Sequence, residues 1–266
     1  MADTVLLDVA DGVATLTLNR PDVLNVLSVA MMQDLAEAVR ALAARKDVAV
    51  VVITGAGAHF MAGGDLKDFS EHLHLSSEAR LATFRAMIAQ HINPTVETLQ
   101  GLPQPVIAKV RGACAGFGLS LMLGCDFALC ADNSVFTTAY SAIGLPGDGG
   151  ASYFLPRLVG RRKAAELLLL AERFDTAEAL RLGLINRAVP EAELDAVTEQ
   201  FVARLKAGPR HAYAEIKRLL AGSHDNQLES QLQNEAEAFG RCGATADFAE
   251  GVTAFLGKRK PGFKDV

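Results

Sequence analysis

The stretch VRGACAGFGLSLMLGCD, from Val110 to Asp126, indicates the fold class of this chain. It is typical of a buried strand that ends in a glycine-rich turn, followed by a helix that is apolar almost all round until an aspartate. Such a turn can cradle a phosphate, receive an oxyanion or simply pack tightly, because glycine lets the backbone approach a ligand closely. The side chains of Phe117 and Ser120 decide which chemistry this turn can support.

A second stretch, GAGAHFMAGGDL from Gly55 to Leu66, has the same arrangement of strand, glycine loop and helix. Each stretch alone is a weak signal, since glycine also serves tight packing. Neither fits GxGxxG in a βαβ unit or the GxxxxGK[ST] phosphate loop, which disfavours nucleotide binding. Together the two loops indicate two backbone amide donors that face one point.

Composition excludes several classes of protein. The chain has 266 residues, of which 50% are hydrophobic and 21% charged, and its formal net charge is -5. The acidic balance gives no footprint for nucleic acid, and the apolar run at 167–171 is too short to span a bilayer. Four cysteines without a CxxC pair predict buried free thiols and no metal site. We expect a cytoplasmic protein with neither a nucleic-acid nor a membrane partner.

The first two thirds of the chain alternate between strand and helix patterns. Asp11-Gly12 predicts a hairpin, Ser28 is expected to cap a helix that ends near Arg45-Lys46, and Pro94 is expected to kink a longer helix. The predicted strands are Val5–Val9, Val13–Leu18, Val48–Thr54, Pro105–Val110, Asp126–Ala131 and Val135–Thr137. The longer helix is predicted over residues 76–102.

Helical periods dominate from Arg161 onward. They predict helices over 161–171, 176–182, 191–207, 209–221, 227–240 and 244–256. The breaks at Gly183–Asn186 and Ala207–Pro209 are the expected boundaries between a main part and a helical part. We predict a core over residues 1–200 and a C-terminal helical region over 201–266.

Five segments, in this order and spacing, resemble the crotonase family, the enoyl-CoA hydratases and isomerases. They are HFMAGGDL (59–66), VRGACAGFGLSLMLGCD (110–126), IGLPGDGGASYFLPRLVG (143–160), RLGLINRAVP (181–190) and FLGKRKPGF (255–263). The resemblance covers the chain from about Val5 to Phe263. It implies an α/β fold, a spiral of repeated ββα units with a C-terminal helical region used for trimerisation. The expected assembly is a homotrimer, or a hexamer of two trimers.

The resemblance also implies an acyl-CoA thioester as substrate and no separate cofactor, since coenzyme A is part of the substrate. By motif position, the amides of Ala62 and Phe117 are expected to hold the thioester oxygen as it gains enolate charge. A preorganised donor of this kind contributes about 2.7 to 4 kcal/mol. The Phe117 side chain is expected to narrow the acyl pocket. The predicted substrate-binding residues are Gly63, Gly64, Asp65, Lys67, Gly116, Ser120, Tyr140, Lys260 and Phe263.

Hydration in this family relies on two glutamates that position and activate one water. In this chain their positions hold Ser120 and Tyr140. Because a serine and a tyrosine lack a base poised near neutral pH, we do not expect efficient hydration by the usual route. Decarboxylases of the family pair a tyrosine with a histidine, but the histidine position here is Gly64.

Asp148 remains, at the position where isomerases and a related dehalogenase of the family place an aspartate. A single base beside an oxyanion hole is sufficient to move a proton from one carbon to another. The alternative is a structural role for Asp148, as an Asx turn or a helix cap. His72 and His74, in the segment after the first glycine loop, are weaker candidates for contact with the substrate.

We therefore predict an enzyme that shifts a double bond in an enoyl-CoA, with Asp148 as its base and with Ala62 and Phe117 at the oxyanion. The alternatives are hydration through a non-standard acid and base, or an acyl-CoA-binding protein that has lost catalysis.

Overall fold

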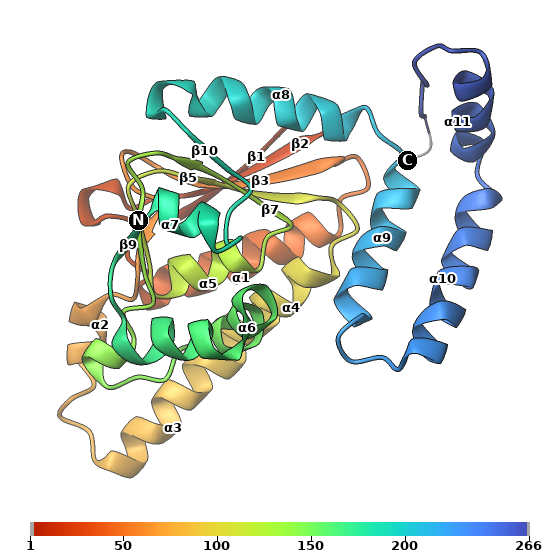
Figure 1. Cartoon of the computed structure of the whole chain (residues 1–266). Coiled ribbons are helices and arrows are strands. Elements are labelled where there is room, and N and C mark those ends of the chain that lie inside the picture. The colour runs from red at the N-terminus through yellow and green to blue at the C-terminus, as the bar shows by residue number, and fades with distance from the viewer. Residues whose placement is uncertain (1–2, 265–266) are drawn as a thin grey trace.

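The computed structural model describes residues 3–264 (Figure 1). Each turn of the chain gives one strand to a six-stranded sheet and the next strand to a four-stranded sheet, as β3 and β4, β5 and β6, and β7 and β8. Helices connect one such strand pair to the next. The predicted spiral of repeated ββα units with C-terminal helices is confirmed.

The large sheet has the order β1-β2-β3-β5-β7-β10, and only its β1–β2 pair is antiparallel. Its strands are β1 (Val5–Ala10), β2 (Val13–Leu18), β3 (Val50–Gly55), β5 (Val106–Val110), β7 (Phe127–Ala131) and β10 (Arg187–Val189). The small sheet has the order β4-β6-β8-β9, with β4 (Met61–Ala62), β6 (Ala113–Ala115), β8 (Val135–Thr137) and β9 (Phe174–Asp175). The strands β1, β2, β3, β5, β7 and β8 match the predicted runs within two residues, whereas the short strands β4, β6, β9 and β10 were not predicted.

Helices cover both faces of the large sheet, which explains why β3 is buried along its whole length. On one face, α8 (Leu194–Lys206) packs Phe201, Val202 and Leu205 against the sheet. On the other face lies α1 (Val29–Ala43), which begins where the Ser28 hydroxyl accepts a hydrogen bond of 3.2 Å from the Met31 amide, as predicted.

The helix expected over 76–102 has three parts. A π-helical turn, η2 (Ile88–Ile92), separates α3 (Ser77–Met87) from α4 (Asn93–Gly101), so the irregularity lies just before Pro94. The remaining helices of the core are η1 (Pro21–Val23), α2 (Leu66–Ser70), α5 (Phe117–Leu123), η3 (Ser141–Ile143), α6 (Ala151–Leu170), α7 (Thr176–Arg181) and η4 (Glu191–Glu193).

Two differences from the predicted elements concern glycine. The helix predicted from Arg161 is the second half of α6, which begins ten residues earlier at Ala151 and is interrupted at Gly160, where φ is 75°. The break at Gly183–Asn186 separates no part of the fold, because β10 follows it directly and pairs with β7.

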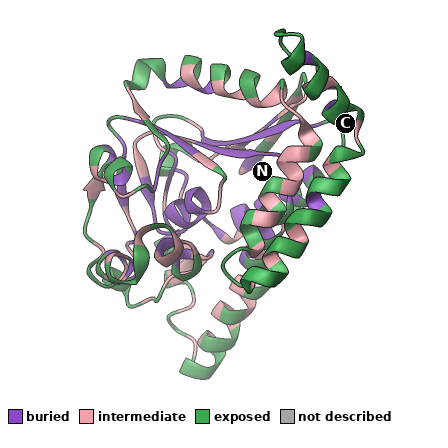
Figure 2. Cartoon of the chain, turned by 45° about the vertical axis from the view of Figure 1, so that its right-hand side comes forward, coloured by how far each residue is buried: buried purple, intermediate pink, exposed green. Residues whose placement is uncertain are grey.

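The C-terminal arm consists of α9 (Arg210–Gly222), α10 (Leu228–Gly243) and α11 (Ala246–Leu256), and it stands beside the core (Figures 1 and 2). Residue 200 falls inside α8, which belongs to the core by packing, so the arm begins after Gly208. Large apolar side chains lie exposed along the arm: Ile216, Leu220, Leu228, Leu232, Phe239, Phe248, Phe255 and Leu256. Within residues 3–264, no helix is both long and apolar enough to cross a lipid bilayer.

Candidate active site

Three parallel strands of the small sheet bring the predicted site residues to one edge. β4 pairs with β6, and β6 pairs with β8, all in parallel. Their carboxyl ends therefore meet at the same edge, and the next residues of the chain gather there. These are Gly63 and Gly64 after β4, Gly116 and Phe117 after β6, and Tyr140 shortly after β8.

The first two of these loops touch each other. A Cβ added at Gly116 would lie 3.1 Å from the Gly63 Cα and 4.0 Å from the Gly64 nitrogen. Gly63 and Gly116 also have φ values of 99° and 52°, in the region that favours glycine. The close approach of the two loops thus depends on the absence of side chains, and it confirms that these loops face one point.

The structure corrects the amide predicted after β4. The Ala62 N–H donates to the Leu24 carbonyl at 3.0 Å, so this hydrogen is not available to a substrate. Leu27, three residues after Leu24, also binds this loop: its amide donates to the Gly63 carbonyl, and its carbonyl accepts from the Asp65 amide. In the part of the chain that the structure describes, the Gly64 amide has no acceptor, and it lies next to Gly116. Gly64 replaces Ala62 as the candidate donor.

The amide of Phe117 stays the second predicted donor. Phe117 is the first residue of α5, and amides in the first turn of a helix have no partner within the helix. Its ring does not line an open acyl pocket, because it is only 1% exposed and packs in the core. A Cβ at Gly149 would lie 2.7 Å from this ring, so Phe117 supports the loop that carries Asp148.

Polar contacts brace the loop after β4. Asp65 caps α2 by accepting from the Lys67 amide at 3.1 Å, and its carboxylate pairs with the Arg20 guanidinium at 2.9 Å. The same guanidinium nitrogen donates to the Val26 carbonyl at 2.6 Å. Asp65, which was predicted to bind substrate, therefore holds the loop instead, while the Lys67 side chain is exposed.

Asn25 is a second brace, which the sequence analysis missed. It is fully buried, accepts from the Arg20 amide at 2.8 Å and donates to the carbonyls of Ala56 and His59 at 3.0 and 2.8 Å. Both Leu24 and Asn25 are left-handed, with φ of 57° and 56°. An asparagine in LNVL, between a 3-10 turn and a capped helix, is the signal that could have revealed it, because asparagine tolerates this conformation.

Ser120, Tyr140 and Asp148 form a chain of hydrogen bonds beside the two amides. The Tyr140 hydroxyl donates to Asp148 Oδ1 at 2.6 Å, and it lies 2.9 Å from the Ser120 hydroxyl. Since the tyrosine has one hydrogen, Ser120 is the donor in its own bond while Asp148 is ionised. Ser120 and Tyr140, which we expect at the positions of the two hydratase glutamates, thus bind each other, and Tyr140 holds one oxygen of the Asp148 carboxylate.

The structural alternative for Asp148 is not supported. The N-cap of α6 is Gly150, with no side-chain cap, and Asp148 contributes its backbone carbonyl to the Ala151 amide. Burial raises the pKa of the Asp148 carboxyl above its ordinary value, and the hydrogen bond from Tyr140 partly offsets this. Burial and the neighbouring Asp148 charge raise the pKa of the Tyr140 phenol, which disfavours it as a base.

A groove of about 740 Å³ adjoins these residues. Phe69 lines it and packs against Gly64, and Leu145, which also lines it, donates its amide to the Tyr140 carbonyl. Of the two histidines considered, His72 packs its ring against Phe84 and His74 is exposed. Neither joins the chain from Ser120 to Asp148.

The predicted tail residues lie elsewhere. Phe263 packs beside Gly251 of α11, Lys260 is exposed, and the Gly262 amide donates to Glu250. Figure 1 shows α11 at the far end of the arm, on the opposite side of the molecule from β9 of the small sheet. The tail therefore does not reach the site of its own chain.

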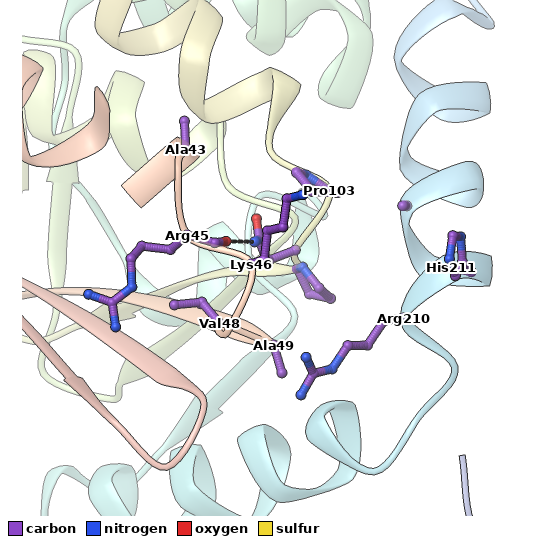
Figure 3. A pocket seen from close by; sticks show the side chains of 11 residues that line it. Ala43, Arg45, Lys46, Val48, Ala49, Pro103, Arg210 and His211 are labelled. Carbon is purple, nitrogen blue, oxygen red and sulfur yellow. Dashed lines mark hydrogen bonds between the residues drawn. The ribbon is translucent and has the colours of Figure 1, made fainter. Parts of the chain in front are cut away.

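A separate pocket of about 420 Å³ lies at the amino ends of β3 and β5, between the core and α9 (Figure 3). Arg210 extends from α9 toward Ala49 there, while Arg45 turns away and pairs with Asp47. None of the predicted site residues lines this pocket.

Comparison with known proteins places this geometry in a family. The profile of the enoyl-CoA hydratase/isomerase family matches residues 8–266. A Rhodobacter capsulatus protein named "Probable enoyl-CoA hydratase" is 37% identical over 98% of this chain and 97% of its own length. The 1,2-epoxyphenylacetyl-CoA isomerase of Escherichia coli K12 is 35% identical over 99% of both chains.

A crystal structure of an enoyl-CoA hydratase from Polaromonas sp. JS666 superimposes with a TM-score of 0.88, at 34% identity, over 98% of this chain and 99% of that chain. Similarity to relatives of different activity, over nearly the whole length, fixes the family and the fold but not the reaction. The chain belongs to the enoyl-CoA hydratase/isomerase family, that is, the crotonase family.

Proposed function

We propose that this protein is an enoyl-CoA isomerase that converts a 3-enoyl-CoA into its conjugated 2-enoyl isomer. The observation that carries the proposal is the chain from Ser120 through Tyr140 to Asp148, in which hydroxyl groups occupy both hydratase positions and orient a single carboxylate. One positioned carboxylate beside two unpaired amides fits proton transfer between carbons.

The proposed reaction has two proton transfers. Asp148 removes a proton from C2, and the electron pair moves into the thioester carbonyl to give an enolate. The amides of Gly64 and Phe117 donate to the enolate oxygen. When the enolate collapses, the C3–C4 double bond shifts to C2–C3, and C4 takes the proton back from Asp148. No water or redox partner is consumed.

Tyr140 is a positioning residue in this scheme. Its hydroxyl binds Oδ1 of Asp148, which leaves Oδ2 to take the proton. After the transfer the proton lies on Oδ2, and Oδ1, now the carbonyl oxygen of the acid, still accepts from Tyr140. The Ser120 hydroxyl remains the donor to Tyr140. The same three residues therefore satisfy both protonation states of the base.

The two alternatives make different demands. Hydration needs a second acid or base to activate water. The pKa of the Tyr140 phenol is raised, which disfavours Tyr140 as that base. A protein that only binds acyl-CoA needs no oriented carboxylate, whereas burying one has a cost. Both arguments favour isomerisation.

We also propose that the protein acts as a homotrimer, or as a hexamer of two trimers. The exposed apolar side chains of the arm need a covering surface, and such patches typically mark interfaces. The tail residues Lys260 and Phe263, which lie far from their own site, would then contact the coenzyme in a neighbouring subunit, and Lys67 would contact it from within.

The test is to supply the purified protein with 3-hexenoyl-CoA and, separately, with crotonyl-CoA. We expect conversion of the first to 2-hexenoyl-CoA and little water addition to the second. Hydration faster than isomerisation would support the hydratase alternative. Tight binding of both thioesters without turnover would support the binding protein.

A further inference from the structure

The groove beside the catalytic residues is lined mainly by apolar side chains. Leucine, isoleucine and phenylalanine side chains form most of its wall, and several are exposed, including Leu66, Leu73 and Leu81. Exposed apolar walls around a concave site are typical of a ligand-binding groove. Among the residues of 3–264 that line it, Arg80 is the only charged one.

Contacts between side chains place Arg80 at a distance from the catalytic centre. Phe69 touches Gly64, where a Cβ would lie 2.9 Å from the Phe69 ring. The Phe69 and Phe84 rings meet edge to face, with centroids 5.3 Å apart. Arg80 precedes Phe84 by four residues of α3, about 6 Å along the helix axis. A substrate chain that follows this wall outward from Gly64 passes two aromatic rings before it meets a guanidinium.

The guanidinium of Arg80 has unused donors. It donates to the Leu73 carbonyl at 3.2 Å, and in the described part of the chain no carboxylate lies within ion-pair distance of it. An arginine presents five N–H groups in a fork that suits a carboxylate. Apolar surroundings strengthen such a pair, because they lower the local dielectric constant.

We propose that this groove selects acyl-CoA substrates that carry a second carboxylate at the far end of the acyl chain, with Arg80 as its partner. The inference rests on the proposed function for the placement of the thioester, since it takes Gly64 and Phe117 as the thioester end of the groove. The methylene chain lies along Phe69, Phe84 and the leucines, and the terminal carboxylate reaches the guanidinium.

The test uses saturated thioesters, which bind without reacting. Calorimetry compares adipoyl-, suberoyl- and sebacoyl-CoA, each with a free terminal carboxylate, with hexanoyl-, octanoyl- and decanoyl-CoA. We expect at least one dicarboxylic thioester to bind about tenfold more tightly than its neutral counterpart, as one charge-assisted hydrogen bond allows. This preference should fall with added salt, because Arg80 is partly exposed.

Arg80→Gln should abolish the preference and leave the affinity for the neutral thioesters unchanged. Arg85→Gln is the matched control, because Arg85 lies on the same helix, is exposed and does not line the groove. Equal binding of the two series by the wild type, or a preference that survives Arg80→Gln, would overturn the proposal.

The outcome separates this inference from the proposed function. Binding of saturated thioesters requires no proton transfer, so a protein that fails to isomerise 3-hexenoyl-CoA can still show the preference. Conversely, an active isomerase that binds both series equally contradicts only the role of Arg80.

Discussion

The loop after β4 and the loop after β6 each present one amide to the same point, but different forces hold them. Polar contacts that involve Arg20, Asn25 and Asp65 brace the first loop. The second loop leads into α5, whose seven residues are all buried, and Phe117 packs beneath Gly149. An oxyanion site can therefore be fixed by hydrogen bonds on one side and by packing on the other, and the two sides should fail in different ways.

The loop after β4, which is held by polar contacts, should be destabilised most by Asn25→Ala. The change leaves the carbonyls of Ala56 and His59 and the Arg20 amide without their partner in a buried place, and it puts alanine in a left-handed conformation. We expect a loss of about 3 to 5 kcal/mol in the free energy of unfolding. Urea denaturation measures it, and the exposed Asn133→Ala is the control.

Activity sharpens this prediction. If Asn25 positions the Gly64 amide, kcat of the folded fraction should fall about a hundredfold, since a displacement of about 1 Å has that effect. A destabilised variant with unchanged kcat would show that Asn25 supports the fold but not the site.

The loop after β6, which is held by packing, should be destabilised by Gly149→Ala. The new Cβ would lie 2.7 Å from the Phe117 ring and 3.0 Å from the Ser120 Cβ, at a φ of 58°. We expect the free energy of unfolding, measured by urea denaturation, to fall by about 2 to 4 kcal/mol, because overpacking and backbone strain act together. Gly144→Ala separates the two causes, because its φ is 76° but a Cβ there meets no atom within 4 Å. Equal losses in both variants would mean that packing against Phe117 contributes nothing.

Tyr140→Phe should have the smallest effect, since it removes one hydroxyl and preserves the ring. The hydrogen bond from Tyr140 lowers the Asp148 pKa, so its loss should raise that pKa further. Because the base must be ionised, activity is lost as pH falls through this pKa, and the acidic limb of the pH–kcat profile should move to higher pH. We expect kcat at the optimum to fall up to about tenfold.

The control for this variant is Tyr153→Phe, at an exposed tyrosine outside the site. An acidic limb that stays in place in Tyr140→Phe would remove Tyr140 from the positioning of Asp148.

The sequence predicted most of the strands and helices, because hydrophobic period and capping residues are local signals. It also placed Ser120, Tyr140 and Asp148 at the site, but not the hydrogen bonds that join them. It misplaced one amide because motif spacing does not say which N–H at a strand end is already bound, and Ala62 is held by Leu24. The Arg20–Asp65 pair spans 45 positions, so no local pattern could reveal it.

The most direct test of the account is kcat of Asp148→Asn with 3-hexenoyl-CoA, measured together with the affinity for hexanoyl-CoA. The amide side chain can still accept from Tyr140, but it cannot take a proton from C2. We predict a loss of about a thousandfold in kcat with nearly unchanged affinity. Full activity in this variant would contradict the claim that Asp148 carries the proton.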